Sequence, residues 1–389
     1  MKTRKIYYES AYLQEFEAEV IKDKQIDGRW CVALDGTGFY PGGGGQPPDI
    51  GLLGGMPVID CFMKDGIIYH VMESMPFFKR NSTMRGKIDF NRRYAFMQNH
   101  SGEHVLSGLA KSRFGATNVG FHMSEKGFTI DFDLPLSAYE LNELEKAAND
   151  IIWQGVDVQL SVVSGTEMAA IDARSKKDFA ADEDVRLVDM PGYDLCACAG
   201  LHVANLHEVG IVKVAGHQRY KGGVRLYVYC GNDALWDYTR KNDIMRQVSV
   251  ALSAETGSII DAVGRQKNIN IELKKEIDGL RSQIFMLKCA AIAENSTLEY
   301  YFEEGLDAND IRRFAKMAAE KTKIAIVFSG QDGAYKYAAC TSDKTADFGG
   351  FVQDMLAALE GRGGVNGMVA QGAVKADLAA ITAYLEGLR

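Results

Sequence analysis

The chain has 389 residues, which is too long for one ordinary core and leads us to expect two or three domains. Its content of 47% hydrophobic and 25% charged residues is typical of a folded globular protein and excludes a disordered or fibrous one. The net charge of −8 argues against a protein that coats nucleic acid, although it is compatible with a local basic face. The N-terminus turns polar before a signal-peptide core develops and the apolar runs are of strand length, so we expect a cytoplasmic protein without a membrane span.

Residues 1–90 are predicted to form a small β-barrel. Short alternating runs, such as Trp30 to Leu34 and Gly66 to Met72, are separated by glycine-rich turns, as a small barrel or an open sheet requires. The strongest of these turns is the segment from Phe39 to Gly51, which contains four consecutive glycines. Because such a run destabilises regular structure, we expect a loop or a close backbone approach there.

Residues 91–235 are predicted to form a mixed α/β domain. A helix is expected from Asn91 to Gly115, where apolar residues recur with helical spacing before a glycine. A second helix is expected from Ser137 to Trp153, because Ser137 and Glu140 have the spacing of a capping box. Strands are expected at 156–163, 210–215 and 224–230.

The remaining residues are predicted to form a helical linker, 236–295, and a small C-terminal α/β domain, 296–389. The linker carries a coiled-coil-like seam with alternating three- and four-residue spacings, in which Asn270 occupies one position. The seam residues are Val263, Leu273, Ile277, Leu280, Ile284 and Leu287. We expect this seam to pair with an earlier helix or, as we favour, with a second copy in a homodimer.

In the C-terminal domain, helical stretches at 310–321, 351–359 and 376–388 flank strands at 324–329 and 335–340. The segment from Gly361 to Val374 is expected to be a second glycine-rich loop. The whole chain is therefore predicted to be an α+β protein.

Two pairs of residues predict a metal site. His100 and His104 are four residues apart on the first predicted helix, which places both imidazoles on one face. Cys198 and His202 repeat this spacing after a turn that contains proline and glycine. Nitrogen and sulfur donors in this combination suit zinc and do not suit calcium or magnesium. The four residues together therefore indicate a Zn²⁺ site.

Two other interpretations account for fewer of these residues. The segment from His100 to His104 also satisfies the H-x-x-E-H pattern, in which Glu103 acts as a general base beside zinc. That pattern requires a further carboxylate ligand and leaves Cys198 and His202 unexplained. The second interpretation, with surface histidines and a core cysteine, treats the two pairs as coincidence.

The motifs as a set resemble those of the alanyl-tRNA editing proteins, which are free-standing relatives of the editing domain of alanyl-tRNA synthetase. The C-terminal part, with the loop Ala370 to Gly372, resembles the C-terminal domain of that synthetase, as in a long-form editing protein. Ala199 and Leu201 depart from the family pattern, which has glycine and threonine there. The matching residues are Asp35, Thr37, Phe39 to Pro41, Gly43 to Pro47, Asp49, Gly51, His100, His104, Cys198, His202 and Gly222 to Gly231.

The resemblance implies hydrolysis of the ester that joins serine or glycine to the 3′-adenosine of the tRNA for alanine. It implies catalytic or sensing roles for Thr37 and Gln46, and it places the backbone of Gly43, Gly44 and Gly45 near the ester, although a tight structural turn accounts equally well for each glycine. The C-terminal domain is implied to contact tRNA, and its clustered cations are Arg312, Arg313 and Lys316. Two alternatives remain open: a non-catalytic tRNA-binding protein stabilised by zinc, and editing of threonyl-tRNA.

Overall fold

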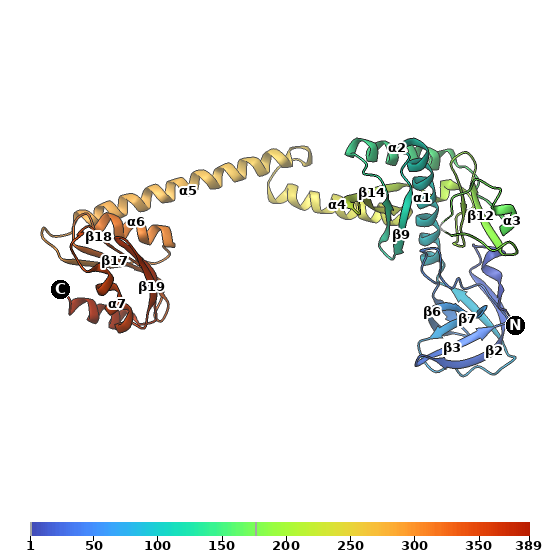
Figure 1. Cartoon of the computed structure of the whole chain (residues 1–389), viewed down its shortest axis with the longest axis horizontal. Helices are drawn as coiled ribbons and strands as arrows, with labels where there is room; N and C mark the ends of the chain where they lie inside the picture. The colour runs from blue at the N-terminus through green and yellow to red at the C-terminus, as the bar shows by residue number, and fades with distance from the viewer. Residues whose placement is uncertain (1, 176) are drawn as a thin grey trace. The chain divides into compact units, whose positions relative to one another are not determined.

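The computed structural model describes residues 2–175 and 177–389 and has mixed α and β structure, as the sequence predicts (Figure 1). The chain divides into two compact units, of which the first ends at Gln247 and the second runs from Val248 to Arg389. None of the described helices combines the length and the apolar composition that crossing a membrane requires.

Six strands near the N-terminus close into a barrel in the order β2-β3-β7-β6-β5-β8. Side chains alternate along β2, where Phe16, Ala18 and Val20 are buried and the residues between them are exposed. Asp27 and Gly28, both with positive φ, form the two-residue turn between β2 and β3. The strands are β2 (Glu15–Ile26), β3 (Arg29–Leu34), β5 (Gly51–Leu53), β6 (Met56–Lys64), β7 (Ile67–Met72) and β8 (Thr83–Ile88), and β1 (Arg4–Lys5) pairs separately with β4 (Gly36–Thr37).

A long central helix, α1 (Phe90–Phe114), follows the barrel. Its N-terminus is capped by Asp89, whose side chain accepts from the Arg92 N–H, and Gly115 ends it in the left-handed conformation. Every residue from Phe96 to Ala110 is buried, because α1 packs against α2, strand β13 and the sheet that contains β9, β10 and β15. Because α1 is covered on all sides, even its polar side chains in this stretch are inaccessible to solvent.

Two sheets and a second helix surround α1 in the first unit. The four-stranded sheet has the order β14-β15-β10-β9, and the three-stranded sheet has the order β11-β12-β13. The predicted capping box of α2 is confirmed, because Ser137 and Glu140 exchange hydrogen bonds. The elements are β9 (Asn118–Ser124), β10 (Gly127–Phe132), α2 (Ala138–Gln154), β11 (Gln159–Ser164), α3 (Gly165–Met168), β12 (Asp184–Met190), β13 (Asp194–Ala197), β14 (Val212–Tyr220), β15 (Gly223–Cys230) and α4 (Gly231–Ala251).

The second unit consists of a long helix and a five-stranded sheet in the order β16-β17-β18-β20-β19. Phe285 of α5 stacks on Phe314 of α6, with ring centroids 4.5 Å apart, on one face of the sheet. Helices α7 and α8 contribute Met355 and Ile381 to the core on the other face. The elements are α5 (Ile259–Ala290), β16 (Leu298–Phe302), α6 (Ala308–Ala318), β17 (Ile324–Ser329), β18 (Tyr335–Thr341), α7 (Phe348–Ala358), β19 (Arg362–Asn366), β20 (Val369–Val374) and α8 (Leu378–Glu386).

The prediction of a glycine-rich loop from Gly361 to Val374 is wrong, because this segment forms the hairpin of β19 and β20. Glycines allow the two strands of the hairpin to approach closely. A Cβ at Gly372 would lie 2.2 Å from the Arg362 carbonyl oxygen and 2.7 Å from the Cα of Gly363. The glycines therefore allow two strands to pair where side chains would collide.

Candidate metal centre

The structure brings His100, His104, Cys198 and His202 together, with their nearest nitrogen and sulfur atoms all within 4.8 Å of one another. The Cys198 Sγ lies 3.5 Å from the Nε2 of His100 and 3.5 Å from the Nε2 of His202. The three histidines are at most 3% exposed, so the cluster is screened from bulk water. Two segments about a hundred residues apart thus meet in one buried group.

Glycines allow the elements around this cluster to approach one another. A Cβ at Gly200 would lie 2.0 Å from Cε1 of His100, so the loop that follows Cys198 reaches the imidazole only without a side chain at this position. A Cβ at Gly108 would lie 2.2 Å from the Tyr193 carbonyl oxygen, so this glycine lets the chain that enters β13 lie directly on α1. Both contacts set the distance between the two halves of the cluster.

Each histidine of the cluster has an oxygen atom beside its Nδ1. The Gln46 Oε1 lies 3.0 Å from Nδ1 of His100, and the Ser101 Oγ lies 3.3 Å from Nδ1 of His202. The Asp194 Oδ2 lies 2.9 Å from Nδ1 of His104. Contacts of this kind fix the imidazole orientation and leave Nε2 free to bind a metal, as in known zinc sites.

Charge in the cluster favours a metal cation. Burial raises the pKa of the Cys198 thiol, but the adjacent charge and hydrogen bonds of His100, with those of the other two histidines, outweigh it and hold this pKa well below its usual value. Burial, together with the charges of the other two histidines, holds the pKa of His202 well below its usual value. A thiolate and a neutral imidazole are the forms that bind zinc, so the shifts of Cys198 and His202 fit this ion.

A second set of charged residues, Glu103, Arg174 and Asp194, packs around His104. Arg174 lies 2.9 Å from Asp194 and 3.5 Å from the Oε1 of Glu103, and all three side chains are largely buried. Burial raises the pKa of Asp194, but His104 and Arg174 outweigh it and lower this pKa to about 2. Burial likewise lowers the pKa of His104, whereas Asp194 and Cys198 raise it to about 9. The sequence analysis missed Asp194 and Arg174, although Asp194 precedes Cys198 by only four residues.

Glu103 is held beside the Nε2 of His104. Its Oε1 accepts hydrogen bonds from Ser107 and from the Asn118 amide, and its Oε2 lies 3.7 Å from the Nε2 of His104. The H-x-x-E-H interpretation thus names a carboxylate that does lie near the cluster.

A pocket of about 820 Å³ opens onto the cluster, a size typical of small-molecule and cofactor sites. His100, His104 and Cys198 line it together with Gly44 and Gly45 of the glycine loop. The four glycines from Gly42 to Gly45 all have positive φ, and Gly43 exchanges two backbone hydrogen bonds with Gln46. The glycine segment is therefore both a tight turn and a wall of the pocket.

Thr37 and Gln46 are not among the described residues that line this pocket. The Thr37 hydroxyl lies 2.7 Å from Nε2 of His70 and accepts from the Phe39 N–H. The Gln46 Oε1 accepts from the Leu201 N–H as well as facing His100, so its carbonyl holds the loop from Cys198 to His202, which we call the metal loop, in place. Roles of these two side chains toward a substrate remain predictions.

The three cations predicted to contact tRNA lie on or beside the exposed face of α6, in the second unit. Arg312 and Lys316 are exposed and one turn apart. Arg313 is half-buried, forms an ion pair with Asp310 at 3.0 Å, and covers the ring of Phe285. Arg312 and Lys316 are therefore more available to a ligand than Arg313.

Comparison with known proteins relates the cluster to a family. Residues 185–227, which include Cys198 and His202, match the family described as the threonyl and alanyl tRNA synthetase second additional domain. The chain is 27% identical to the alanine–tRNA ligase of Pyrococcus abyssi over an alignment of 401 positions, which covers 96% of this chain and 42% of the ligase. The chain is related to alanyl-tRNA synthetases.

Further relatives show the same partial coverage. The alanine–tRNA ligase of Pyrobaculum aerophilum is 32% identical over 287 residues, which are 68% of this chain and 31% of the ligase. The chain thus spans less than half the length of these synthetases. Among solved structures, the C-Ala domain of Aquifex aeolicus alanyl-tRNA synthetase matches 24% of this chain and 91% of that domain, at 23% identity and a TM-score of 0.21.

Proposed function

We propose that this chain is a zinc-dependent hydrolase that acts in trans, in the cytoplasm, on the tRNA for alanine mischarged with serine or glycine. One observation carries the proposal: His100, His104, Cys198 and His202 converge in one cluster, and the first three line a pocket of about 820 Å³. The relation to synthetases for alanine supports the substrate class.

His100, His104, Cys198 and His202 would hold the zinc ion. When bound, zinc would act as a Lewis acid only toward an oxygen that replaces one of these ligands or expands the shell, and with all four ligands bound it would shape the pocket. Four protein ligands fill a tetrahedral shell, so the side chains around the shell must position the water. Glu103 is suited to this task, because its Oε1 is occupied by Ser107 and Asn118 while its Oε2 lies beside the metal-facing nitrogen of His104.

The reaction requires little more than a positioned water and a donor for the developing oxyanion. Water attacks the ester carbonyl carbon, the bond to the 3′ oxygen of the terminal adenosine breaks, and that oxygen takes up a proton. Gly44 and Gly45 line the pocket and offer backbone N–H groups close to the cluster. The products are free serine or glycine and uncharged tRNA.

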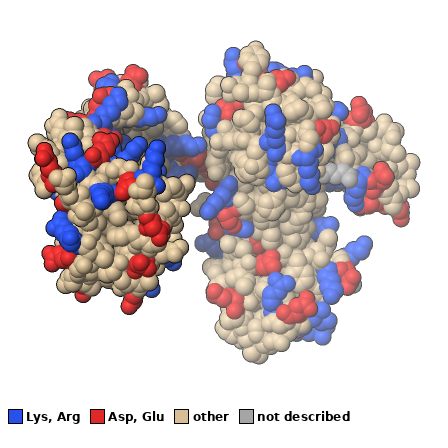
Figure 2. Space-filling model, turned by 60° about the vertical axis from the view of Figure 1, so that its left-hand side comes forward, with Lys and Arg blue, Asp and Glu red and all other residues tan. Residues whose placement is uncertain are grey.

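The second unit is proposed to hold the tRNA body. Positive and negative side chains are interspersed over the visible face of the protein, in line with its net charge of −8 (Figure 2). Recognition therefore depends on local cations, and Arg312 and Lys316 are exposed on one face of α6.

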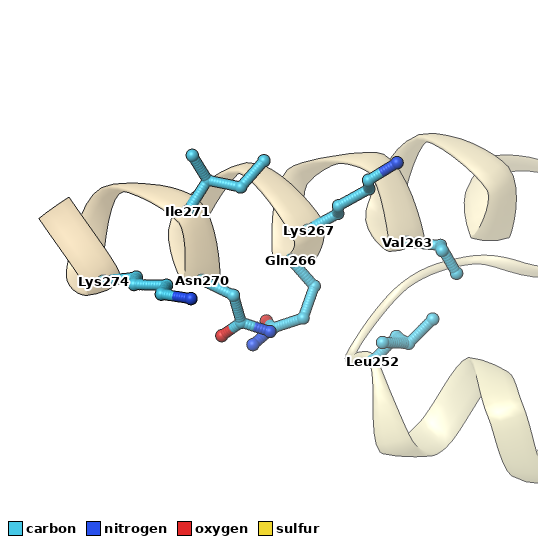
Figure 3. A pocket seen from close by; sticks show the side chains of 7 residues that line it. All are labelled: Leu252, Val263, Gln266, Lys267, Asn270, Ile271 and Lys274. Carbon is cyan, nitrogen blue, oxygen red and sulfur yellow. The ribbon is translucent and has the colours of Figure 1, made fainter. Parts of the chain in front are cut away.

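We further propose that two copies pair through α5. The apolar seam on this helix is 48–72% exposed, which in a folded protein marks a surface that a partner covers. Near the start of the seam, Leu252, Val263 and Asn270 line a groove (Figure 3). A heptad seam with one asparagine is typical of helices that pair in register.

The deciding experiment is deacylation of seryl-tRNA for alanine with the full chain. We expect hydrolysis that His104→Ala abolishes and that His217→Ala, a change at an exposed histidine on β14, leaves intact. If the unaltered chain binds zinc and tRNA without hydrolysis, the non-catalytic alternative is correct. Faster hydrolysis of seryl-tRNA for threonine would favour the threonyl alternative.

A further inference from the structure

The pocket beside the metal cluster contains two cations that no carboxylate neutralises. Four basic side chains line it, and two of these are paired: Arg174 with Glu103 and Asp194, and Lys177 with Glu183 at 2.7 Å. Lys5 and Arg186 line the same pocket and make no ion pair with any carboxylate in the described part of the chain. The pocket thus keeps two positive charges that are available to a ligand.

Arg186 is locked in position by the metal loop. Its Nη1 donates to the Cys198 carbonyl oxygen at 3.0 Å and to the Gly200 carbonyl oxygen at 2.8 Å, so the guanidinium lies against the segment that bears the thiolate. Its other N–H groups make no hydrogen bond to a described residue. A partly buried cation without a counter-charge is costly, and an anionic ligand relieves that cost.

Tyr8 joins the two cations into one surface. Its hydroxyl donates to the Ala199 carbonyl oxygen at 2.8 Å. Its ring centroid lies 5.1 Å from Cζ of Arg186 and 5.7 Å from Nζ of Lys5. Lys5, Tyr8 and Arg186, which we call the cationic wall, therefore lie side by side along the metal loop.

Apolar side chains continue the pocket beyond the cationic wall. Val162 of β11 pairs with Arg186 of β12 in the sheet register and is 65% exposed, and Met63 from the barrel is 52% exposed. Unpaired cations next to exposed apolar and aromatic groups are the features by which proteins bind single-stranded nucleic acid, since they contact phosphate and base respectively. A serine or glycine moiety alone needs neither feature.

We propose that Lys5 and Arg186 bind the last phosphodiester of a single-stranded RNA 3′ end, with the terminal base against Met63 and Val162. This inference rests on the proposed function, because an ester at the 3′ oxygen near Cys198 places that phosphate first along the strand. Arg186 donates to the carbonyl oxygen of Cys198 itself, so the cationic wall directly adjoins the cluster at which the ester would lie. Free phosphate and mononucleotides share this chemistry and are separate arms of the test.

The experiment measures binding of the full chain to a short, fluorescently labelled RNA that ends in a 3′-adenosine. A second RNA carries a neutral methylphosphonate at the last linkage only. We expect the unaltered protein to bind the neutral RNA about tenfold more weakly, as loss of one charged contact predicts. Lys5→Gln should lose part of this discrimination, because Arg186 still contacts the phosphate, and the double variant Lys5→Gln/Arg186→Gln should bind both RNAs with nearly equal affinity.

Three further variants sharpen the result. Asp184→Asn should tighten binding, because this exposed carboxylate precedes Arg186 by two residues on the same strand and repels phosphate. Arg219→Gln removes an exposed charge on β14 outside the pocket and should keep the full discrimination. Arg186→Gln should behave like Lys5→Gln, and its zinc content shows whether the metal loop is intact.

Equal affinity of the unaltered protein for the two RNAs would overturn the proposal, as would full discrimination in Lys5→Gln. Displacement of the RNA by inorganic phosphate as effectively as by a mononucleotide would overturn the assignment to an RNA end. Discrimination without deacylation would refute the proposed hydrolase and keep the phosphate subsite. Deacylation with no effect of the last phosphate would refute the phosphate subsite and keep the proposed hydrolase.

Discussion

Helices α1 and α5 are the two longest of the described part of the chain, and they differ in what surrounds them. In α1, every residue from Phe96 to Ala110 is buried, including Asn99 and Ser101. In α5, only Ile259, Ala262, Phe285 and Cys289 are buried, and its apolar seam is exposed. Buried polar groups and exposed apolar ones are the informative deviations from ordinary burial. The first helix therefore carries the candidate metal cluster, and the second carries the exposed seam through which we propose that two copies pair.

The largest expected effect is on the metal. Cys198→Ala should remove bound zinc and destabilise the first unit by about 3 kcal/mol or more, because the proposed ion would join α1 to the loop after β13. Metal analysis together with calorimetry measures both effects. Unfolding of the second unit, which contains none of the four residues, is the internal control. Unchanged zinc content would remove Cys198 from the site.

The barrel should show a pH dependence that the second unit lacks. Burial lowers the pKa of His70 to about 4 in the folded protein, whereas the unfolded side chain titrates near 6.5. Between these values the unfolded state binds more protons, so stability is lost as the pH falls from about 6.5 to 4 and is constant above that range. The difference corresponds to about 3 kcal/mol. Denaturant unfolding of the unaltered chain and of His70→Gln at pH 7 and pH 5 should show about 2 kcal/mol of this difference, because pH 5 lies above the folded pKa, and the variant should lack this part of the pH dependence.

The seam on α5 should determine oligomeric state. Replacing both Ile277 and Leu280 by Glu should weaken association about a hundredfold, since two apolar contacts are exchanged for charges in an interface. Asn268→Glu, on the opposite side of the helix, is the matched control. Light scattering of the unaltered chain should give twice 42.8 kDa. A single 42.8 kDa particle at every concentration would refute the dimer.

The smallest effects are expected on α6. Arg312→Gln and Lys316→Gln should each weaken tRNA binding a few-fold and lower its salt slope by about one. Arg313→Gln should instead lower the stability of the second unit, because this side chain pairs with Asp310 and covers Phe285. Equal loss of tRNA affinity in all three variants would show that exposure does not separate their roles.

Local signals in the sequence were sufficient for several elements. The capping box of Ser137 and Glu140 is confirmed, as is the helix that carries His100 and His104, because caps and apolar spacing act within a few residues. The hairpin at 361–374 was missed, because its glycines suggested a loop, whereas they allow close contact between two strands, which the sequence does not show. The division at residues 90, 235 and 295 into four domains remains a prediction.

The candidate site was only partly predictable for a related reason. His100 and Cys198 carry spacings visible in the sequence, whereas Asp194 and Arg174 contribute through contacts that depend on the tertiary fold. The Gln46 Oε1 contacts His100 and Leu201, which the sequence did not show, and the role of this side chain toward a substrate remains a prediction. Motif spacing identifies ligands, but the groups that orient them become visible only when the sheets are in place.

The contacts of Tyr8 and Tyr12 have a consequence for synthesis of the protein on the ribosome. The Tyr8 hydroxyl donates to the Ala199 carbonyl oxygen, and the Tyr12 hydroxyl accepts from the Ala204 N–H and contacts Glu208. These pairs join residues about two hundred positions apart. Because synthesis proceeds at about 5–20 residues per second, Tyr8 and Tyr12 are made on the order of ten seconds or more before these partners. The N-terminal segment and His100 thus emerge well before the loop that completes the cluster, and a nascent chain that stops before residue 198 has no metal centre to assemble.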